Sequence, residues 1–228
     1  MSLFYYCQQI DQERAYLDPH ETGHLKVMKR SIGDQISFTD GKGNRYQGTI
    51  QAIKRNESVV KIQCKEEDLS RELTRHVEIT VGLSRWNRLS LLIEKAVELG
   101  VKGVNLVNCE RSNYHTVNME KVEKTARKAL KQCGGTIMPT CRSLSSLKEA
   151  YTDGICHVLL NPLAKSHVNT ISFPQKTNIF IGPEGGLTEK ELETIRSLST
   201  ETLEISLGKR ILRLETAAIV AIGLISFS

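Results

Sequence analysis

Strand-like and helix-like segments alternate from residue 76 to the end of the chain, and this alternation constrains the fold more than any other feature. Five short apolar runs have the length and composition of buried strands: VEITVGL, VNLV, GICHVLLN, NIFIG and LEISL. Segments with an apolar stripe at helical spacing accompany them, and the longest are NRLSLLIEKAVELG, NMEKVEKTARKALKQCGG and TEKELETIRSL. Strands that alternate with helices in this way predict an α/β domain with a largely parallel sheet over residues 76–228.

The preceding part of the chain, residues 1–72, has the pattern of short strands joined by turns. The run QISFTDGKGNRYQGTI alternates apolar and polar residues on either side of DGKGN, where Gly41 and Gly43 supply the positive φ of a hairpin. SVVKIQC is a further strand, and one short helix is expected over residues 21–30. Several short strands at this spacing predict a small β-barrel, with the domain boundary between residues 69 and 76.

Composition and the apolar runs indicate a protein of the cytoplasm. Hydrophobic residues make up 39% of the chain and charged residues 25%, which is ordinary for a globular protein. The last apolar run, Thr216–Phe227, has 12 residues, whereas a membrane-spanning helix needs roughly 20. The first residues lack the basic start and long apolar stretch of a signal peptide. We therefore expect a cytoplasmic protein without a membrane segment.

The spacing of the cysteines and the distribution of charge indicate which ligands and partners the chain can bind. The six cysteines are scattered, with no C-x-x-C pair and no histidine at zinc-ligand spacing, so no metal site is expected. Net charge is +5, and between Ser84 and Lys131 there are ten basic residues against five acidic ones. Within this region one face of a predicted helix carries four lysines, which are Lys121, Lys124, Lys128 and Lys131. Such a region suits a polyanionic partner, although charge alone is also typical of a solvated helix face.

Three loops follow predicted strands of the α/β domain. Ligands of open parallel sheets bind beyond the carboxyl ends of the strands, and three such ends here are LLNP, IGPEGG and LGKRILR. In IGPEGG, Gly185 and Gly186 are expected to adopt positive φ and to let the backbone approach a ligand. Thr188 and Glu191 predict a capping box at the next helix. The common phosphate-binding glycine motifs are absent, so a nucleoside triphosphate is not expected, and an ordinary strand-to-helix turn is the alternative.

Charged residues crowd the start of the last apolar helix, in LGKRILRLETA. Arg213 stands in or just before the first helical turn, where a cation opposes the helix dipole by roughly 0.3–1 kcal/mol. Glu215 in the first turn is favourable. Two interpretations follow: the acid neutralises its basic neighbours, or the loop faces an anionic substrate.

Two C-terminal motifs carry a resemblance to a known family. IGPEGGLTEKE followed by SLGKRILRLETAA resembles the RsmE family of bacterial ribosomal RNA methyltransferases, in the SPOUT superfamily. Earlier segments resemble other parts of that family, so the resemblance covers nearly the whole chain; they are HLKVMKRSIGDQISFTDGKGNRYQGTI, LLIEKAVELGVKGVNLVNCERSNYH and ARKALKQCGGTIMP. The chain departs from the family pattern at Arg85 or Arg88, where a lysine is usual, at Gly135, where an arginine often stands, and at Leu214, where threonine or alanine is usual.

This resemblance implies an RNA-binding PUA-like barrel over residues 1–72 and a SPOUT methyltransferase domain over residues 76–228. In that family the second domain contains a deep trefoil knot, which most folds avoid, and its last helix packs in a homodimer. The three loops become the pocket for the cofactor S-adenosyl-L-methionine. The implied cofactor-binding residues are Leu160, Asn161, Pro162, Ile181, Gly182, Pro183, Glu184, Gly185, Gly186, Leu207, Gly208, Ile211 and Leu212.

The implied reaction is methyl transfer to N3 of a uridine in the decoding region of 16S ribosomal RNA, uridine 1498 in the usual numbering of that RNA. Arg213 would stabilise the developing uracil anion. Glu215 or Glu184 would accept the proton, although either acid can instead be a structural partner. The implied RNA-binding residues are His24, Lys26, Lys29, Arg30, Arg85, Arg88, Arg111, Lys124, Lys128 and Arg210.

Two other functions stay open at this point. One is a different SPOUT reaction, such as ribose 2′-O-methylation of transfer RNA, and the other is a non-catalytic RNA-binding or ribosome-assembly protein that keeps the fold. Detection of cofactor binding separates the non-catalytic protein from the enzymes. Mapping of the methylated nucleotide separates the two reactions.

Overall fold

The computed structural model describes residues 4–167, 172–199 and 202–227. The chain forms two compact units. The N-terminal unit comprises Met1–Glu72 together with Arg127–Met138, and the C-terminal unit comprises Leu73–Ala126 together with Pro139–Ser228. The sequence pattern did not indicate that residues 127–138 belong with the first unit, because helix α3 (Met119–Cys133) is one continuous amphipathic helix.

The N-terminal unit is built on one six-stranded sheet in the order β1-β4-β5-β6-β3-β2. β1 runs parallel to β4, and the other pairs are antiparallel. The strands are β1 (Phe4–Tyr6), β2 (Gln9–Ile10), β3 (Arg14–Leu17), β4 (Gln35–Thr39), β5 (Asn44–Ile53) and β6 (Ser58–Glu67). The predicted hairpin around DGKGN is confirmed, since it joins β4 to β5 and its Gly41 and Gly43 have φ of 75° and 90°. The pattern did not predict β1, β2 or β3.

Helix α1 (Pro19–Val27) is shifted from the predicted range of 21–30. It begins earlier because the Asp18 carboxylate caps it, accepting a hydrogen bond from the backbone N–H of Glu21 at 2.8 Å. Pro19 then fills the first helical position, where its fixed φ suits the helix and its missing N–H costs nothing. The helix ends at Val27, and Lys29 adopts the left-handed φ of 53°.

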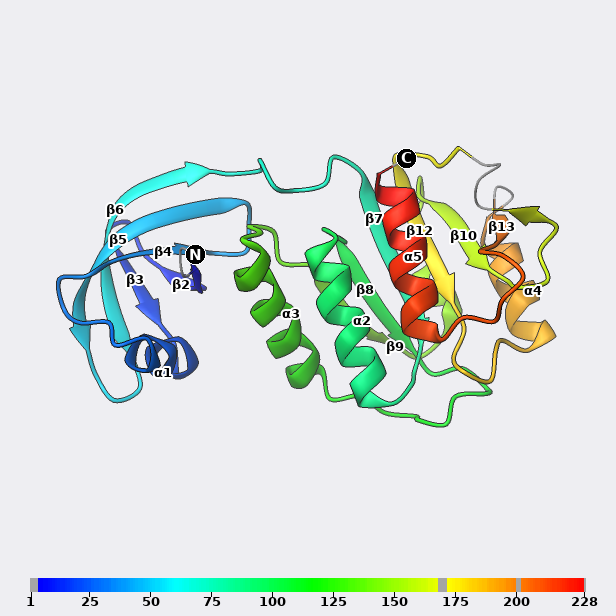
Figure 1. The fold of residues 1–228 in the computed structure, drawn as a ribbon, viewed down its shortest axis with the longest axis horizontal. Coiled ribbons are helices and arrows are strands. Elements are labelled where there is room, and N and C mark those ends of the chain that lie inside the picture. The colour runs from blue at the N-terminus through cyan, green and yellow to red at the C-terminus, as the bar shows by residue number, and fades with distance from the viewer. Residues whose placement is uncertain (1–3, 168–171, 200–201, 228) are drawn as a thin grey trace. The chain divides into compact units, whose positions relative to one another are not determined.

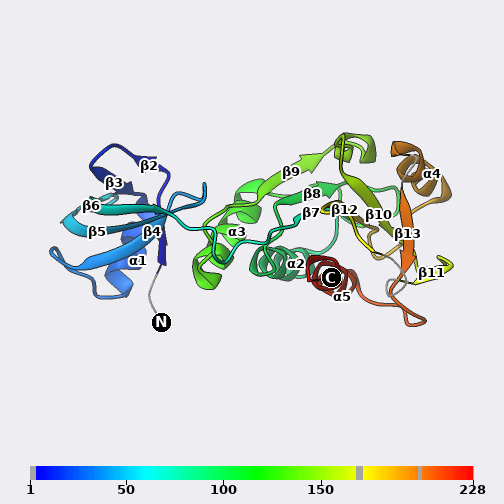
Figure 2. The ribbon, with the colours of Figure 1, turned by 90° about the horizontal axis from the view of Figure 1, so that it is seen from above.

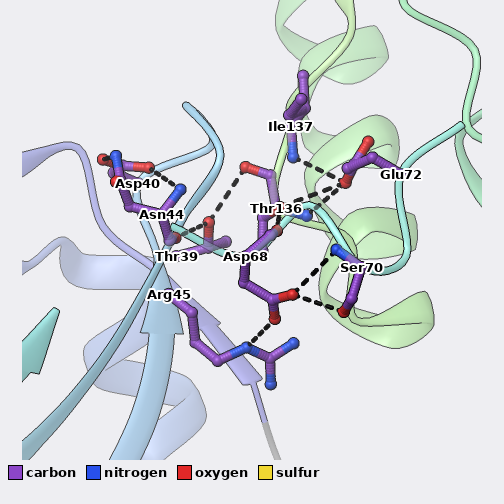
Figure 3. A network of polar contacts seen from close by, with 9 residues as sticks. All are labelled: Thr39, Asp40, Asn44, Arg45, Asp68, Ser70, Glu72, Thr136 and Ile137. Atoms are coloured by element: carbon purple, nitrogen blue, oxygen red, sulfur yellow. Dashed lines mark hydrogen bonds and ion pairs between the residues drawn. The ribbon is translucent and has the colours of Figure 1, made fainter. Parts of the chain in front are cut away.

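Residues 127–138 join the N-terminal unit through hydrogen bonds around Thr136, as Figure 3 shows. The Thr136 hydroxyl donates to the carbonyl of Asp68 at 2.5 Å, and the Thr39 hydroxyl donates to the carbonyl of Thr136 at 3.3 Å. The Glu72 carboxylate accepts from two successive backbone N–H groups of this segment, at 2.8 and 3.1 Å. These contacts satisfy buried polar groups that follow α3, and they hold the segment on the sheet.

The C-terminal unit has one seven-stranded sheet in the order β11-β13-β10-β12-β7-β8-β9. Every neighbouring pair in it is parallel, which confirms the predicted α/β fold with a parallel sheet. The strands are β7 (His76–Gly82), β8 (Gly103–Val107), β9 (Thr140–Leu144), β10 (Cys156–Leu160), β11 (Ser166–His167), β12 (Lys176–Ile181) and β13 (Leu203–Ser206). The edge strands β9 and β11 were not predicted, because neither carries an apolar run.

Helices cover both faces of this sheet. α2 (Trp86–Glu98) and α5 (Leu214–Ser226) pack side by side on one face, while α4 (Glu189–Leu198) lies on the other with the short 3₁₀ helix η1 (Leu147–Ala150) (Figures 1 and 2). The core under α4 includes Leu159, Phe180 and Ile195. Each large apolar side chain buried there contributes about 1.5–3 kcal/mol relative to exposure in water.

The run Thr216–Phe227 is apolar nearly all round, but the helix that contains it is not buried on every side. α5 begins at Leu214 with Arg213 as its N-cap residue, which confirms the placement of Arg213 just before the first turn and of Glu215 in it. One side is fully buried, but Val220, Leu224 and Phe227 are 37%, 41% and 70% exposed in the single chain. Among the residues described, no helix combines the length and apolarity needed to cross a membrane.

Candidate active site

The three predicted loops meet at one edge of the C-terminal sheet. β13, β10 and β12 are neighbours in the sheet and run parallel, so their carboxyl ends point the same way. Those ends are Ser206, Leu160 and Ile181. The topology therefore gathers residues 160–162, 181–186 and 207–212 at the edge where open parallel sheets bind their ligands.

Hydrogen bonds tie the loop after β10 to the end of β13. The backbone N–H of Asn161 donates to the carbonyl of Ile205 at 2.9 Å, and its side-chain amide donates to the Glu204 carboxylate at 2.5 Å. The Ser206 hydroxyl lies 3.4 Å from the carbonyl of Pro162 and accepts from the N–H of Gly208 at 3.2 Å. The loop ends are thus held to one another before any ligand binds.

The IGPEGG loop uses its glycines in two different ways. Gly186 has a φ of 73°, and its N–H donates to the carbonyl of Pro183 at 2.8 Å. Gly185 does not have positive φ, so that part of the prediction is wrong. It is needed for space instead, because a Cβ there would lie 2.8 Å from the carbonyl oxygen of Arg111.

The helix after this loop begins with the predicted capping box. The Thr188 hydroxyl accepts from the N–H of Glu191, and the Glu191 carboxylate accepts from the N–H of Thr188 at 2.8 Å. The other oxygen of Glu191 accepts from the N–H of Glu110 at 2.9 Å. One buried carboxylate thus clamps the IGPEGG loop to the loop after β8, a contact that the capping motif alone did not reveal.

Replacement of Gly186 by alanine is expected to destabilise the fold by about 1 kcal/mol, because a side chain opposes the left-handed conformation. For a chain of this size the melting temperature should fall by about 2–4 °C. Gly23→Ala is the matched control, since Gly23 lies inside α1 with no atom near its Cβ position, and it should be stabilising. Calorimetry measures both, and equal shifts would show that the loop tolerates a side chain.

Glu184 is engaged by two neighbours. The Ser84 hydroxyl donates to its carboxylate, and the Arg88 guanidinium lies 2.7 Å from the same oxygen. Burial acts to raise the pKa of Glu184, but the Ser84 hydroxyl, a backbone N–H and Arg88 stabilise the carboxylate and hold its pKa below the usual value. Ser84 was not among the predicted site residues, and only its place two residues after the end of β7 marks it in the sequence.

Arg213 and Glu215 lack the side-chain partners that Glu184 has. Arg213 is exposed, caps α5 without a side-chain hydrogen bond, and forms no ion pair among the described residues. Glu215 is only 9% exposed, and its Oε2 is buried with no hydrogen-bond partner in the described part of the chain. The structure thus does not contain the pairing of Arg213 with Glu215 that one interpretation of the sequence required. An orphaned buried carboxylate oxygen costs stability, so its position beside the loop after β13 calls for an explanation.

The predicted RNA-binding residues of the C-terminal unit are mostly on its surface. Arg85 is the exposed N-cap residue of α2, and Arg210 is exposed in the loop after β13. Arg111 donates to the carbonyl of Leu187 at 3.3 Å, so its guanidinium also supports the IGPEGG loop. Lys124 is exposed on α3.

The lysines on α3 do not all face solvent. Lys128 is exposed, but Lys131 is only 8% exposed and lies 2.6 Å from the Glu21 carboxylate, which is fully buried. Lys131 is therefore not part of the exposed basic face. Its ion pair with Glu21 holds the C-terminal end of α3 within the N-terminal unit. The periodicity could not show this, because the acidic partner lies more than a hundred residues earlier in the chain.

The remaining predicted RNA-binding residues lie in and after α1. Lys29 is exposed, Arg30 is half-buried, and Lys26 donates to the carbonyl of Arg55 at 3.3 Å. His24 is half-buried, with its ring centroid 5.2 Å from that of Tyr5, and burial lowers its pKa. His24 is thus poorly suited to hold a phosphate as a cation near neutral pH.

The cysteines and other metal-ligand residues form no further centre. Among the residues described, no group of three or more His, Cys, Asp or Glu side chains is placed to hold a metal ion. Burial raises the pKa of Cys7 to about 11, of Cys109 to about 12 and of Cys141 to about 11. These three thiols stay protonated near neutral pH and are poor nucleophiles.

Comparison with known proteins defines the class. The family model described as an RNA methyltransferase domain matches residues 71–226, and an RNA methyltransferase PUA domain matches residues 17–63. Fold and matches together place the chain in a class of two-domain RNA methyltransferases. This chain belongs to that RNA methyltransferase family, and the resemblance found in its sequence is confirmed.

Similar proteins span nearly the whole chain. Ribosomal RNA small subunit methyltransferase E of Bacillus subtilis is 29% identical over 96% of this chain and 93% of its own length. The crystal structure of a predicted RNA methyltransferase from Thermotoga maritima is 31% identical, with a TM-score of 0.83 over 98% of this chain and 97% of that one. Ribosomal RNA small subunit methyltransferase E of Neisseria gonorrhoeae, bound to S-adenosyl methionine, is 22% identical over 98% of this chain and 96% of that one, and shares the fold with a TM-score of 0.85.

Proposed function

We propose that this chain transfers a methyl group from S-adenosyl-L-methionine to N3 of a uridine in the decoding region of 16S ribosomal RNA. Relatives that carry the name ribosomal RNA small subunit methyltransferase E cover most of the chain. The observation that carries the proposal is the meeting of three loops at the carboxyl edge of the parallel sheet, together with an arginine and a buried carboxylate oxygen that have no partner among the described residues. Such groups suit the proposed reaction, because the uracil anion needs a cation beside it and the N3 proton needs an acceptor.

The loops fit the cofactor through their backbone. Among the described residues, no atom lies within 4 Å of the Cβ position of Gly186, and only His167 comes within that distance of Gly208. Backbone groups of residues 160–162, 181–186 and 207–212 would hold the adenine and ribose of S-adenosyl-L-methionine. The cofactor supplies a methyl group activated by its sulfonium. The chain itself positions the uridine beside the methyl group and stabilises the charge that develops on the uracil.

The two candidate acids differ in their freedom to accept a proton. A uridine N3 carries a proton and is a poor nucleophile until that proton leaves. Glu184 is committed to Ser84 and Arg88, and its lowered pKa makes it a weak base. Glu215 has a buried oxygen without a donor among the described residues, so we assign the proton to Glu215 and a positioning role to Glu184.

Arg213 supplies the positive charge for the same step. Its exposed guanidinium stands at the start of α5, two residues before Glu215, without an ion-pair partner among the described residues. As N3 loses its proton, negative charge spreads onto the uracil carbonyl oxygens. A planar guanidinium can hold that charge through two N–H donors.

RNA contacts would come from both units. Phosphates are held by exposed cations, which here include Lys29, Arg85, Lys124, Lys128 and Arg210. The match to an RNA methyltransferase PUA domain supports RNA binding by the N-terminal unit.

Salt dependence tests the contribution of α3. Changing Lys124 and Lys128 together to alanine should flatten the slope of log affinity against log salt by about 0.7–0.9 for each phosphate that is no longer neutralised. Lys148 and Lys190 are exposed cations of the C-terminal unit that the proposal does not use, so their double alanine variant is the control. Filter binding of small-subunit RNA over a salt series gives the slopes. An unchanged slope in the first variant would assign that helix face to solvent.

A homodimer is part of the proposal. Val220 and Leu224 on α5, with Phe227 at its C-cap, leave an apolar stripe exposed. On the adjacent α2, Trp86 and Leu91 are also more than a third exposed. A second copy of the chain would bury this surface, which light scattering can test. The trefoil knot, the cytoplasmic location and the small-subunit context stay predictions from the family resemblance.

Mass spectrometry of nucleosides tests the reaction. The purified chain, S-adenosyl-L-methionine and unmodified 16S RNA or small subunits should yield 3-methyluridine at one position. Ribose-methylated nucleosides, or methylation of transfer RNA alone, would favour the alternative SPOUT reaction. Cofactor binding without any methylated product would favour a non-catalytic RNA-binding protein.

A further inference from the structure

A pocket of about 270 Å³ opens in the N-terminal unit, and all of its lining residues belong to that unit. The β1–β2 segment, β3, the start of α1, the β5–β6 turn and Arg127 form its walls. The volume lies just below the range of pockets for drug-sized ligands, so it suits one small planar group. Nothing in the proposed reaction uses this pocket.

One wall of the pocket carries stacked planar groups. The Arg127 guanidinium lies over the Tyr6 ring, 4.6 Å from its centroid. An ion pair of 2.9 Å with Asp18 holds the guanidinium in place, and its Nε is buried without a hydrogen-bond partner among the described residues. A guanidinium held over an aromatic ring is a preformed stacking surface, which is how proteins receive unpaired bases of RNA.

The rim of the pocket carries polar side chains that are free to form hydrogen bonds with the edge of a bound base. Gln9 and Asn56 are exposed and their side-chain amides make no hydrogen bond among the described residues. The Glu57 carboxylate has only a loose contact of 3.5 Å with Lys54. Two carboxylates in the walls, of Asp18 and Glu57, disfavour a phosphate inside the pocket.

The carboxylates also indicate which base fits. A carboxylate only accepts hydrogen bonds. Guanine presents two adjacent donors, N1–H and the amino group, whereas uracil has no amino group and two carbonyl oxygens. Lys54 and the exposed Arg55 precede Asn56 in the chain and can hold the phosphates on either side of the inserted base.

We propose that this pocket binds one unpaired nucleobase of the RNA, with a preference for bases that carry an amino group and for guanine above all. It would fix the RNA in register while the target uridine is held by the C-terminal unit. The inference rests on the proposed function, because only an RNA substrate supplies such a base.

Nucleotide titration tests the pocket directly. The full chain is labelled with nitrogen-15 and titrated with GMP, AMP, CMP and UMP, while amide resonances are followed by NMR. GMP should shift the backbone and side-chain amides of Gln9 and Asn56 most, and UMP least. Shifts of equal size for all four nucleotides, or none at these amides, would overturn the proposal. S-Adenosyl-L-methionine, added separately, should shift the backbone amides of Gly182 and of residues 184–186 in either case, and failure there would count against the proposed function instead.

A pair of variants extends the test to RNA. Asn56→Ala combined with Glu57→Gln should weaken binding of a guanine-containing single strand about tenfold, since removal of each hydrogen bond weakens binding several-fold. Gln47→Ala combined with Glu66→Gln is the matched control, because both residues are exposed on the same sheet and neither lines the pocket. Equal affinities for the two variants would refute the assignment. A short peptide library that shifts the same amides without competition from GMP would point to a protein partner and overturn it too.

Discussion

Replacement of Arg213 by alanine is expected to lower methyl transfer by about 10²–10³-fold, the usual loss when one charge-stabilising group is removed. The fold should be unharmed, because Arg213 caps α5 without a hydrogen bond and has no ion-pair partner among the described residues. Its cation opposes the helix dipole by roughly 0.3–1 kcal/mol, so the melting temperature should stay level or rise slightly. Single-turnover transfer to small-subunit RNA and calorimetry measure the two effects.

Two further variants show whether charge or shape matters. Arg213→Lys should recover only part of the activity, because a point charge lacks the planar fork of the guanidinium. Arg210→Ala removes an exposed cation from the same loop and should weaken RNA binding modestly, with transfer from saturated complexes nearly intact. Near-normal transfer by Arg213→Ala, or equal loss in Arg210→Ala, would contradict a specific role for Arg213.

Local chemistry made much of the fold predictable. The DGKGN hairpin and the Thr188–Glu191 capping box depend on residues close in sequence, and both are present as predicted. The parallel sheet followed from alternating apolar strands and amphipathic helices, since its central strands β7, β10 and β12 are buried on both faces. The edge strands β9 and β11 carry polar residues and leave no such pattern.

Interactions between distant segments could not be predicted from one sequence. The burial of Lys131 depends on Glu21, and the attachment of residues 127–138 depends on Asp68 and Glu72. The helical period of α3 gives no sign of either. The exposed stripe on α5 escaped prediction for a related reason, since composition reports apolarity and not which neighbours are available to cover it.

At the candidate site, the sequence predicted which loops come together. It did not show whether Glu184 or Glu215 is free to accept a proton. IGPEGG and LGKRILR lie at the same edge of the sheet as expected, because β12 and β13 run parallel on either side of β10. The commitment of Glu184 to Ser84 and Arg88 requires β7 and β12 to be adjacent, which spacing cannot reveal. The orphaned oxygen of Glu215 is visible only in three dimensions.

Replacement of Glu215 by glutamine is expected to lower methyl transfer by about 10²–10⁴-fold at neutral pH, the scale of a missing general base. Glu184→Gln should cost less, since that carboxylate is held by Ser84 and Arg88 rather than free to take a proton. Stability should hardly change in Glu215→Gln. Loss of an acid from the first turn of α5 costs roughly 0.3–1 kcal/mol, while removal of a buried carboxylate oxygen without a donor offsets it.

The pH profile separates a base from a structural partner. In Glu215→Gln the uridine must lose its N3 proton to solvent, so single-turnover transfer should rise about tenfold per pH unit as long as the uracil itself stays mostly protonated. In the parent chain a side chain takes that proton, so its rate should depend much less on pH over the same range. Glu184→Gln keeps the proton acceptor and should keep the parent profile at a reduced height. If Glu215→Gln instead loses cofactor binding and melting temperature together, with a parent-like profile, the orphaned carboxylate supports the loop and the proton leaves by another route.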